Sequence, residues 1–250
     1  MKDIILEDGE RLDAVNEKIN LIQKKDGLTF GTDAFLLASF IKPRKSGRAL
    51  ELGTGTGIIS LLLAAREKFA HIFALEVQED FAALAKRNAE INLLDSALEV
   101  ICGDIRDLHP SKLGEFDVVF SNPPYMKTDS GKRNDSDYKY IARHEVCGNI
   151  RDFCAAACRM LKHGGKFYVV WRPDRLCDLI TALRDNRLEP KVMTFVCADS
   201  KSAPSMVLIS ATKGGASGMN LTAPLILHSG GDHSTLSPEA QKIYDTLSFD

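Results

Sequence analysis

Short apolar runs alternate with longer helical patterns from position 48 onward. The short runs predict buried strands, and the longer segments predict helices. Strands are expected at 49–52, 72–77, 98–102, 118–121, 166–171, 191–196 and 205–211. Helices are expected at 58–68, 79–92, 150–161 and 173–186. This alternation predicts an α/β fold with a mostly parallel, seven-stranded sheet covered on both faces, in which the last two strands form an antiparallel hairpin.

The two ends of the chain follow different patterns. Residues 12–15 and 19–23 predict a hairpin, and a helix at 34–41 follows it, with Thr32 or Asp33 as the N-cap. Beyond a glycine-rich joint, a small helix is expected with Ser237 as its cap and Pro238 at its first position. We therefore expect three parts: an N-terminal hairpin and helix at 1–47, a core at 48–213 and a short tail at 214–250.

Composition and charge narrow the class of protein. The chain has 250 residues, 44% hydrophobic and 26% charged, which is typical of a soluble globular domain. No uncharged apolar run reaches about 18 residues, so no membrane span is expected. Acidic residues interrupt the N-terminus before a signal peptide can form, and the expected compartment is the cytoplasm. Because the net charge is −2, any nucleic acid must bind through local basic patches.

The six cysteines form no Cys-x-x-Cys pair, so a disulfide scaffold is not expected. Cys154 and Cys158 lie four residues apart in an alanine-rich helical segment, with Cys147 and His144 nearby. A metal site is conceivable there. Small sulfur side chains on the buried face of a helix explain the pattern better, so no metal is expected.

A glycine-rich turn joins the first core strand to the helix that follows it. Gly53, Gly55 and Gly57 allow positive φ angles and bring backbone N–H groups close to a ligand. A dinucleotide-binding turn has the pattern Gly-x-Gly-x-x-Gly, whereas here the third glycine comes one residue early and Ile58 takes its place. The turn therefore favours a ligand without a pyrophosphate.

Three acidic residues stand at or near the ends of the first three core strands. Glu76 can accept both ribose hydroxyls of an adenosine, and Asp104 can reach the adenine amino group. Glu51 precedes the glycines and is expected to face a positive charge. Alternatively, Asp104 only caps the next turn. Carboxylates in place of Lys or Arg suit a ligand that combines an adenosine with a cation, so the expected cofactor is S-adenosylmethionine.

The tetrapeptide Asn122-Pro123-Pro124-Tyr125 follows the apolar run 116–121. The Asn122 amide oxygen and the Pro123 carbonyl can accept both hydrogens of one planar NH₂ group, and the Tyr125 ring can stack on its owner. Pro124 stiffens the loop. Holding both hydrogens favours a pyramidal nitrogen aimed at a methyl donor, so these four residues are the expected catalytic group. The pattern predicts methylation of an exocyclic nitrogen.

Together with the glycine turn and the acids, this tetrapeptide resembles the amino-methylating members of the class I S-adenosylmethionine-dependent methyltransferases. The segment 32–37, Thr-Asp-Ala-Phe-Leu-Leu, resembles the Thr-Asp-x-x-Leu-Leu segment of the bacterial tRNA(Val) adenine-N6 methyltransferase family. The resemblance covers about residues 10–212 and implies a Rossmann-like fold and methylation of N6 of the adenine just 3′ of the anticodon. It implies a cofactor site formed by Thr32, Asp33, Glu51, Gly53, Thr54, Gly55, Gly57, Glu76, Val77, Asp104, Ile105 and Asn122.

Basic residues after the tetrapeptide are expected to hold RNA phosphates; they are Lys127, Lys132, Arg133 and Arg143. Three alternatives remain: glutamine-N5 methylation of a protein, guanine-N2 methylation of rRNA, and a catalytically idle module that binds RNA or S-adenosylmethionine. The glutamine enzymes usually carry an N-terminal helical domain, for which 1–47 is too short and too strand-like. Methylation of DNA adenine is disfavoured because no segment remains for a recognition domain.

Overall fold

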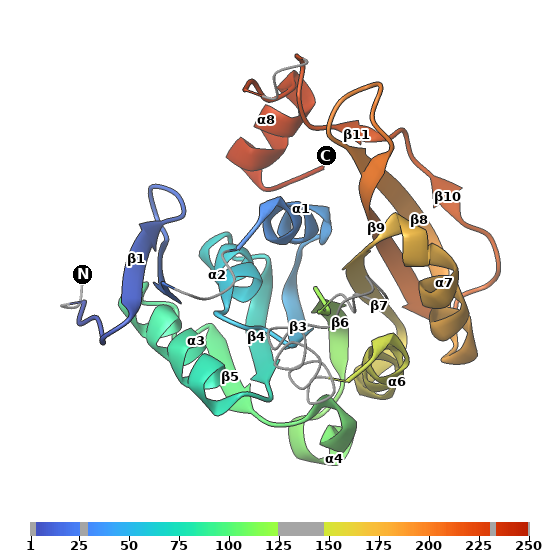
Figure 1. Ribbon diagram of the computed structural model, residues 1–250. Helices are drawn as coiled ribbons and strands as arrows, with labels where there is room; N and C mark the ends of the chain where they lie inside the picture. The colour runs from blue at the N-terminus through green and yellow to red at the C-terminus, as the bar shows by residue number, and fades with distance from the viewer. Residues whose placement is uncertain (1–3, 26–29, 125–147, 231–233, 250) are drawn as a thin grey trace, which may run out of the picture.

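The computed structural model describes residues 4–25, 30–124, 148–230 and 234–249. Its main sheet holds the seven core strands in the order β5-β4-β3-β6-β7-β9-β8 (Figure 1). Their bounds are β3 (Arg44–Leu52), β4 (Phe69–Glu76), β5 (Leu98–Cys102), β6 (Phe116–Ser121), β7 (Leu161–Trp171), β8 (Leu188–Cys197) and β9 (Pro204–Lys213). Strand β9 is antiparallel to both of its neighbours, and the other core pairs are parallel. The predicted α/β fold is confirmed.

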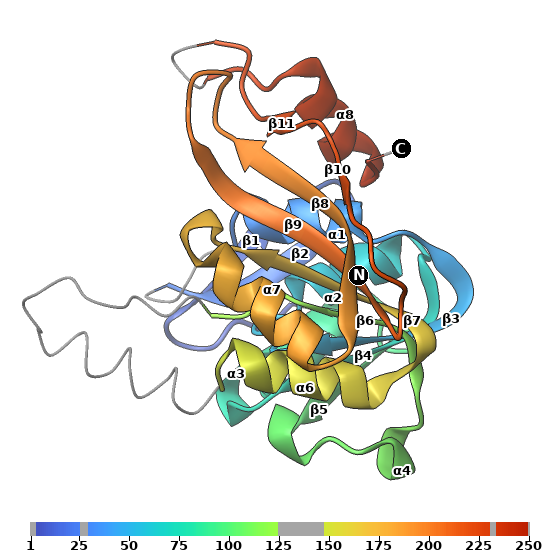
Figure 2. The same cartoon turned by 90° about the vertical axis from the view of Figure 1, so that its right-hand side faces the viewer.

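Helices cover both faces of the sheet (Figure 1, Figure 2). Side chains of a strand point alternately to opposite faces; in β3, Ala49 belongs to one hydrophobic core and Leu50 to the other. Helices α1 (Thr32–Phe40), α2 (Ile58–Ala65) and α3 (Glu79–Ile91) lie on the first face, and η1 (Ile105–Asp107), α6 (Ile150–Met160) and α7 (Leu176–Asp185) lie on the second. Short helices α4 (Pro110–Leu113) and η2 (Pro173–Arg175) occupy connections.

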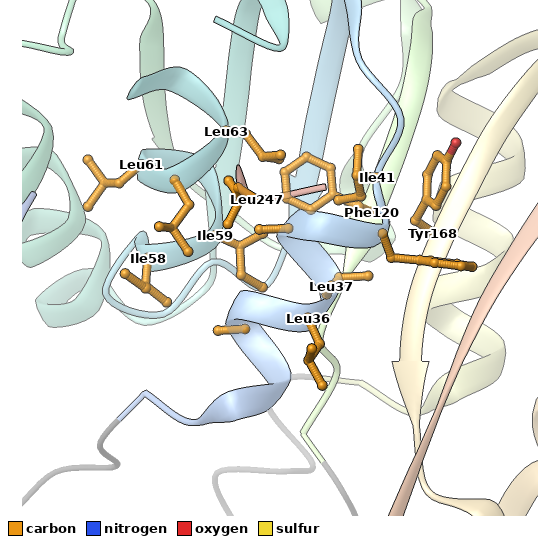
Figure 3. Packing of buried hydrophobic residues seen from close by; sticks show 14 of the residues in the cluster. Leu36, Leu37, Ile41, Ile58, Ile59, Leu61, Leu63, Phe120, Tyr168 and Leu247 are labelled. Atoms are coloured by element: carbon orange, nitrogen blue, oxygen red, sulfur yellow. The ribbon is translucent and has the colours of Figure 1, made fainter. Parts of the chain in front are cut away.

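Helix α1 is apolar around most of its surface and is enclosed by other elements (Figure 3). Leu36 and Leu37 are fully buried in a core that also contains Phe120 of β6 and the apolar residues of α2. A helix with this composition needs cover on several sides, and the sheet, α2 and the tail supply it. The prediction that Thr32 or Asp33 caps this helix is wrong. Gly31 is the N-cap and no side chain caps the helix there; the Asp33 carboxylate instead accepts from the Ala34 N–H and from the Asn122 side chain.

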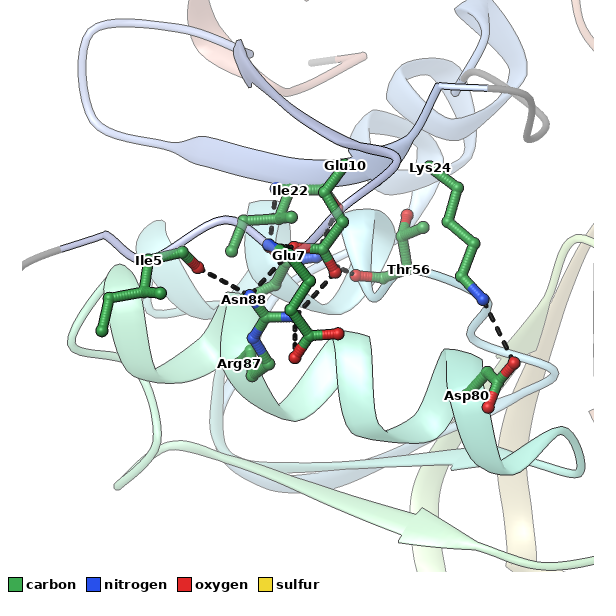
Figure 4. A network of polar contacts seen from close by, with 9 residues as sticks. All are labelled: Ile5, Glu7, Glu10, Ile22, Lys24, Thr56, Asp80, Arg87 and Asn88. Atoms are coloured by element: carbon green, nitrogen blue, oxygen red, sulfur yellow. Dashed lines mark hydrogen bonds and ion pairs between the residues drawn. The ribbon is translucent and has the colours of Figure 1, made fainter.

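The predicted N-terminal hairpin is confirmed and is fixed to helix α3 (Figure 4). It comprises β1 (Glu10–Ala14) and β2 (Asn20–Lys24). Arg87 pairs with Glu10 at 2.7 Å. Asn88 accepts a hydrogen bond from the Ile22 N–H at 2.7 Å and donates one to the Thr56 carbonyl at 2.9 Å. Thr56 lies in the glycine turn, so one buried amide joins the hairpin to that turn.

The tail packs on the core and extends its sheet. Strands β10 (Asn220–Leu221) and β11 (Leu225–Ile226) both pair in parallel with β8, and helix α8 (Pro238–Thr246) packs against α1. Ser237 caps α8 as predicted, because its hydroxyl accepts from the Ala240 N–H at 3.0 Å, and Pro238 is the first helical residue.

One strand starts earlier than the pattern indicates. The predicted helix at 150–161 and strand at 166–171 left 162–165 between them, but α6 stops at Met160 and β7 begins at Leu161. The pairing of β7 with β6 shifts register within this segment, which absorbs the two glycines. At Gly165 a Cβ would stand 2.9 Å from the Lys162 carbonyl, so only glycine fits there without a shift. Among the described helices, none has the length and apolar character that crossing a membrane requires.

Candidate active site

The predicted site residues converge on one edge of the sheet. Parallel strands present their carboxyl ends at the same edge, where ligands of open α/β sheets bind. The glycine turn follows β3, Glu76 ends β4, Asp104 follows β5, and Asn122 follows β6. These four strands are neighbours in the sheet. The edge therefore combines the proposed cofactor turn with the proposed catalytic segment.

The glycine turn has the backbone conformation that its sequence predicts. Gly53, Gly55 and Gly57 have φ angles of +72°, +57° and +88°, in the left-handed region that favours glycine. A Cβ on Gly57 would stand 3.3 Å from the Ala85 Cβ, so this glycine also allows α2 and α3 to pack closely. At Gly55 a Cβ would meet nothing within 4 Å. That side of the turn is open to a ligand.

Glu51 lies beneath the turn and holds it in place. Its side chain is 1% exposed, and its Oε2 accepts hydrogen bonds from the Thr54 hydroxyl at 2.6 Å and the Ser60 hydroxyl at 2.5 Å. Burial raises the pKa of Glu51 from 4.5 to about 7, and the nearby Glu76 carboxylate adds to the increase. The carboxyl is thus poised to change charge near neutral pH. Its contact with a bound cation stays a prediction.

Glu76 is fixed at the end of β4 by backbone N–H groups. Its Oε2 accepts from the Gly55 N–H at 2.8 Å and its Oε1 accepts from the Gln78 N–H at 3.0 Å. The side chain is 5% exposed. A carboxylate has about four lone-pair sites, so these two bonds leave capacity for ribose hydroxyls. The next residue, Val77, is half-buried beside it.

Asp104 caps the short helix η1, as its alternative interpretation predicted. Its Oδ1 accepts from the Arg106 N–H at 2.8 Å, and its carboxylate also pairs with the Arg106 guanidinium. This guanidinium lowers the pKa of Asp104 below its usual value. Ile105 is buried in the core behind it. The capping contact uses part of the carboxylate, and a bond to an adenine amino group stays a prediction.

Asn122 is held by a residue from a distant part of the chain. Its Nδ2 donates to Asp33 Oδ2 at 2.7 Å, across 89 positions of sequence. Asp33 Oδ1 accepts from the Ala34 N–H at 2.9 Å in the first turn of α1. Pro123 is buried and Pro124 is half-buried. Tyr125 and the predicted phosphate contacts lie outside the described residues; those contacts are Lys127, Lys132, Arg133 and Arg143.

A cavity of about 180 Å³ opens beside the contact between Asp33 and Asn122. Its lining comes from the start of α1, the end of β7 and the start of β9: Thr32, Asp33, Trp171, Arg172, Ser205 and Met206. Trp171 is placed in the same way as Asn122, because it stands at the carboxyl end of β7, which is parallel to β6. The sequence prediction overlooked it, although the predicted strand at 166–171 placed it there.

Two further residues support the turn and were also missed. Ser60 contributes a hydroxyl to Glu51, and Asn88 donates to the Thr56 carbonyl. Asn88 is fully buried on the face of α3 that also carries Ala85 and Ala89. A polar residue on an apolar helix face is a signal that could have identified it, because a buried amide requires partners. The Ser60 hydroxyl gives no comparable signal.

The groups at this edge fit S-adenosylmethionine. The open side of Gly55 allows close approach of a ligand, and Glu76 and Asp104 are suited to a ribose and an adenine amine. Glu51 supplies a buried carboxyl group beneath the turn, and its ionised form suits a ligand with a positive charge. When bound, S-adenosylmethionine supplies an electrophilic methyl group. The fold and the site together define a class I S-adenosylmethionine-dependent methyltransferase.

The chain belongs to the methyltransferase small domain family, and the model of that family matches residues 24–184. It is 33% identical over 190 residues to the tRNA1(Val) (adenine(37)-N6)-methyltransferase of Bacteroides fragilis, covering 75% of this chain and 78% of that protein. It is 27% identical over 191 residues to the protein of the same name from Pedobacter heparinus, covering 71% and 80% of the two chains. The resemblance stated from the sequence is confirmed.

Solved structures show the same fold. The crystal structure of a predicted O-methyltransferase from Agrobacterium tumefaciens has a TM-score of 0.70 and 24% identity, covering 87% of this chain and 97% of that one. TYW2 of M. jannaschii in complex with AdoMet has a TM-score of 0.54 and 12% identity, covering 84% and 87%. At these identities the likeness concerns the fold alone.

Proposed function

We propose that the protein transfers a methyl group from S-adenosylmethionine to N6 of an adenine in RNA, in the anticodon loop of a tRNA(Val)-like tRNA. Asn122 carries the proposal, because it stands at the carboxyl end of β6 beside the strand that leads into the glycine turn. The names of the bacterial relatives support tRNA as the substrate. A tRNA substrate also fits the cytoplasm, which we propose as the compartment.

The chemistry depends on holding a weak nucleophile in a reactive geometry. The adenine amino group donates its lone pair into the ring and attacks poorly. Asn122 Oδ1 and the Pro123 carbonyl accept its two hydrogens, which favours a pyramidal nitrogen with its lone pair directed at the methyl group. Positioning supplies much of the rate in this scheme, and the excess proton leaves after transfer.

The cavity beside Asp33 supports a flat aromatic substrate. Its volume of about 180 Å³ and its position between the start of α1 and the end of β7 suit a nucleobase removed from its stack. In our proposal the Tyr125 ring covers one face of that base. Lys127, Lys132, Arg133 and Arg143 are assigned to phosphates of the RNA from the sequence.

The test is methyl transfer by purified wild-type protein and by Asn122→Ala. Labelled S-adenosylmethionine is supplied with tRNA, ribosomes or release factor in separate reactions. We expect transfer to tRNA, recovery of N6-methyladenosine, and a loss of about a hundredfold to a thousandfold in kcat for the variant. The Kd for S-adenosylmethionine, measured by calorimetry, should stay near the wild-type value.

A matched control is Asn220→Ala, which removes the same side chain from the exposed strand β10 and should retain activity. Transfer to a glutamine of release factor or to a guanine of ribosomal RNA would replace the proposed substrate. Transfer to none of the substrates would support the idle binding module. If Asn122→Ala loses cofactor binding as strongly as activity, the role given to Asn122 is wrong.

A further inference from the structure

We propose that Asp33 is a positioning residue that fixes the orientation of the Asn122 amide, so that its oxygen rather than its nitrogen faces the substrate amine. This inference rests on the proposed function and adds a residue to its machinery. From the sequence, Asp33 was expected to belong to the cofactor site and was a candidate cap of the helix at 34–41. Its contact with the catalytic segment gives it a different task.

The contact leaves only one orientation of the amide. An ionised carboxylate has acceptors and no donor, so the Asn122 atom that lies 2.7 Å from Asp33 Oδ2 must be the NH₂ nitrogen. The amide oxygen is then on the opposite side of the side chain. A reversed amide would place two oxygen acceptors against each other at that distance. The chemistry of Asp33 therefore decides which end of Asn122 is directed away from α1.

This choice matters because the two ends of an amide have nearly the same shape and opposite chemistry. An amine substrate offers hydrogens, so it needs the oxygen of Asn122. If the NH₂ end faced the substrate, two donors would meet and the amine would lose one of its two acceptors. Side-chain shape alone cannot prevent this rotation, so a partner with fixed polarity is required.

The Asp33 carboxylate is itself held in place, so it can determine the orientation of the Asn122 amide. Its other oxygen accepts from the Ala34 N–H at 2.9 Å. Asp33 also lies in the first turn of α1, where the helix dipole favours a negative charge. Leu36 and Leu37, one turn further, are fully buried under the elements drawn in Figure 3. The helix that carries Asp33 is therefore fixed by the core.

The charge of Asp33 has a second effect on the same amide. A hydrogen bond to an ionised acceptor is about twice as strong as a neutral one and polarises the donor group. Electron density is pushed toward Asn122 Oδ1, which becomes a better acceptor. As the substrate nitrogen attacks, positive charge develops on it, and a more negative Oδ1 stabilises that charge.

The experiment compares three variants: Asp33→Asn, Asn122→Asp and the double exchange. Asp33→Asn keeps the shape but can offer either a donor or an acceptor, so the orientation is no longer imposed. We expect kcat to fall about tenfold to a hundredfold, with the Kd for S-adenosylmethionine within about twofold of wild type. Asn122→Asp places two carboxylates in contact and should lose more.

In the double exchange, the amide at position 33 donates to the carboxylate at position 122, so donor and acceptor face each other again. We expect at least tenfold more activity than in Asn122→Asp alone. A role of Asp33 confined to folding does not produce such a rescue. Asp80→Asn is the matched control, because Asp80 is an exposed carboxylate in the first turn of α3.

Two results would overturn the inference. One is an unchanged kcat in Asp33→Asn, whether or not cofactor affinity falls. The other is a double exchange no more active than Asn122→Asp. If wild-type protein methylates no tRNA, the proposed function fails separately. The inference is then judged by NMR of the Asn122 side-chain amide: its hydrogens should exchange slowly in wild type and faster in Asp33→Asn, and equal rates would refute it.

Discussion

The buried carboxyl of Glu51 makes the stability of the protein depend on pH in a defined direction. The difference between an ordinary pKa of 4.5 and a folded pKa of about 7 is equivalent to about 3 kcal/mol. Because the folded pKa is raised, the folded protein holds this proton more tightly than the unfolded chain. The contribution is fully present below pH 4.5 and is lost as the pH rises through about 7.

The perturbation that tests this is Glu51→Gln, which removes the charge and retains an oxygen that can accept from Thr54 or Ser60. The assay is urea unfolding at intervals from about pH 5 to about pH 8. The difference in unfolding free energy between variant and wild type should move by about 2.5 kcal/mol in favour of the variant over this range, since part of the contribution is already lost at about pH 5. The Gln side chain of the variant can also change the unfolding free energy by the same amount at every pH. Only the change of the free-energy difference with pH therefore tests the reasoning.

A matched control is Glu79→Gln, on the exposed first turn of α3, which should keep the wild-type slope. If the unfolding free energies of wild type and Glu51→Gln change in parallel with pH from about pH 5 to about pH 8, the reasoning is refuted. A second measurement concerns the cofactor. If Glu51 faces a cation, binding favours the carboxylate, so affinity for S-adenosylmethionine should rise through about pH 7 in wild type and not in the variant.

Two substitutions test other parts of the cofactor site. Gly57→Ala puts a side chain at φ +88°, 3.3 Å from the Ala85 Cβ, and should lower the unfolding free energy by about 1–2 kcal/mol in urea titrations and weaken cofactor binding. An unchanged midpoint would mean that the turn relaxes without cost. Asp104→Ala should raise the Kd for S-adenosylmethionine about tenfold by removing the acceptor for the adenine amine. If calorimetry finds the same Kd, Asp104 serves only as the cap that the structure describes.

The fold could be predicted because each core strand is marked by a short apolar run in its own segment of the sequence. The apolar run of β3, the glycines that follow it, and the acids at or just after the ends of the next two strands are all local patterns. The parallel arrangement then brings these ends together without any information about side-chain contacts. That is why the edge carrying Gly53, Glu76 and Asn122 could be anticipated from the order of the elements alone.

Contacts between distant segments could not be predicted in the same way. The bond from Asn122 to Asp33 joins residues 89 positions apart, and its partners have ordinary side chains. Asn88 reaches Ile22 and Thr56 only because α3 packs against the hairpin. Strands β10 and β11 have two residues each, too few to produce a periodic pattern. Packing, rather than local preference, determines these features.

The pairing of the tail with β8 has a consequence for handling the protein. Strand β8 would otherwise end the sheet with unpaired backbone groups, and β10 and β11 occupy that edge. Such an edge is a template for another copy of the chain. Removing residues 214–250 would also uncover Phe35 and Phe40 of α1, which contact Tyr244 and Phe249. A shortened protein would therefore be prone to aggregation even with every residue of its catalytic edge intact.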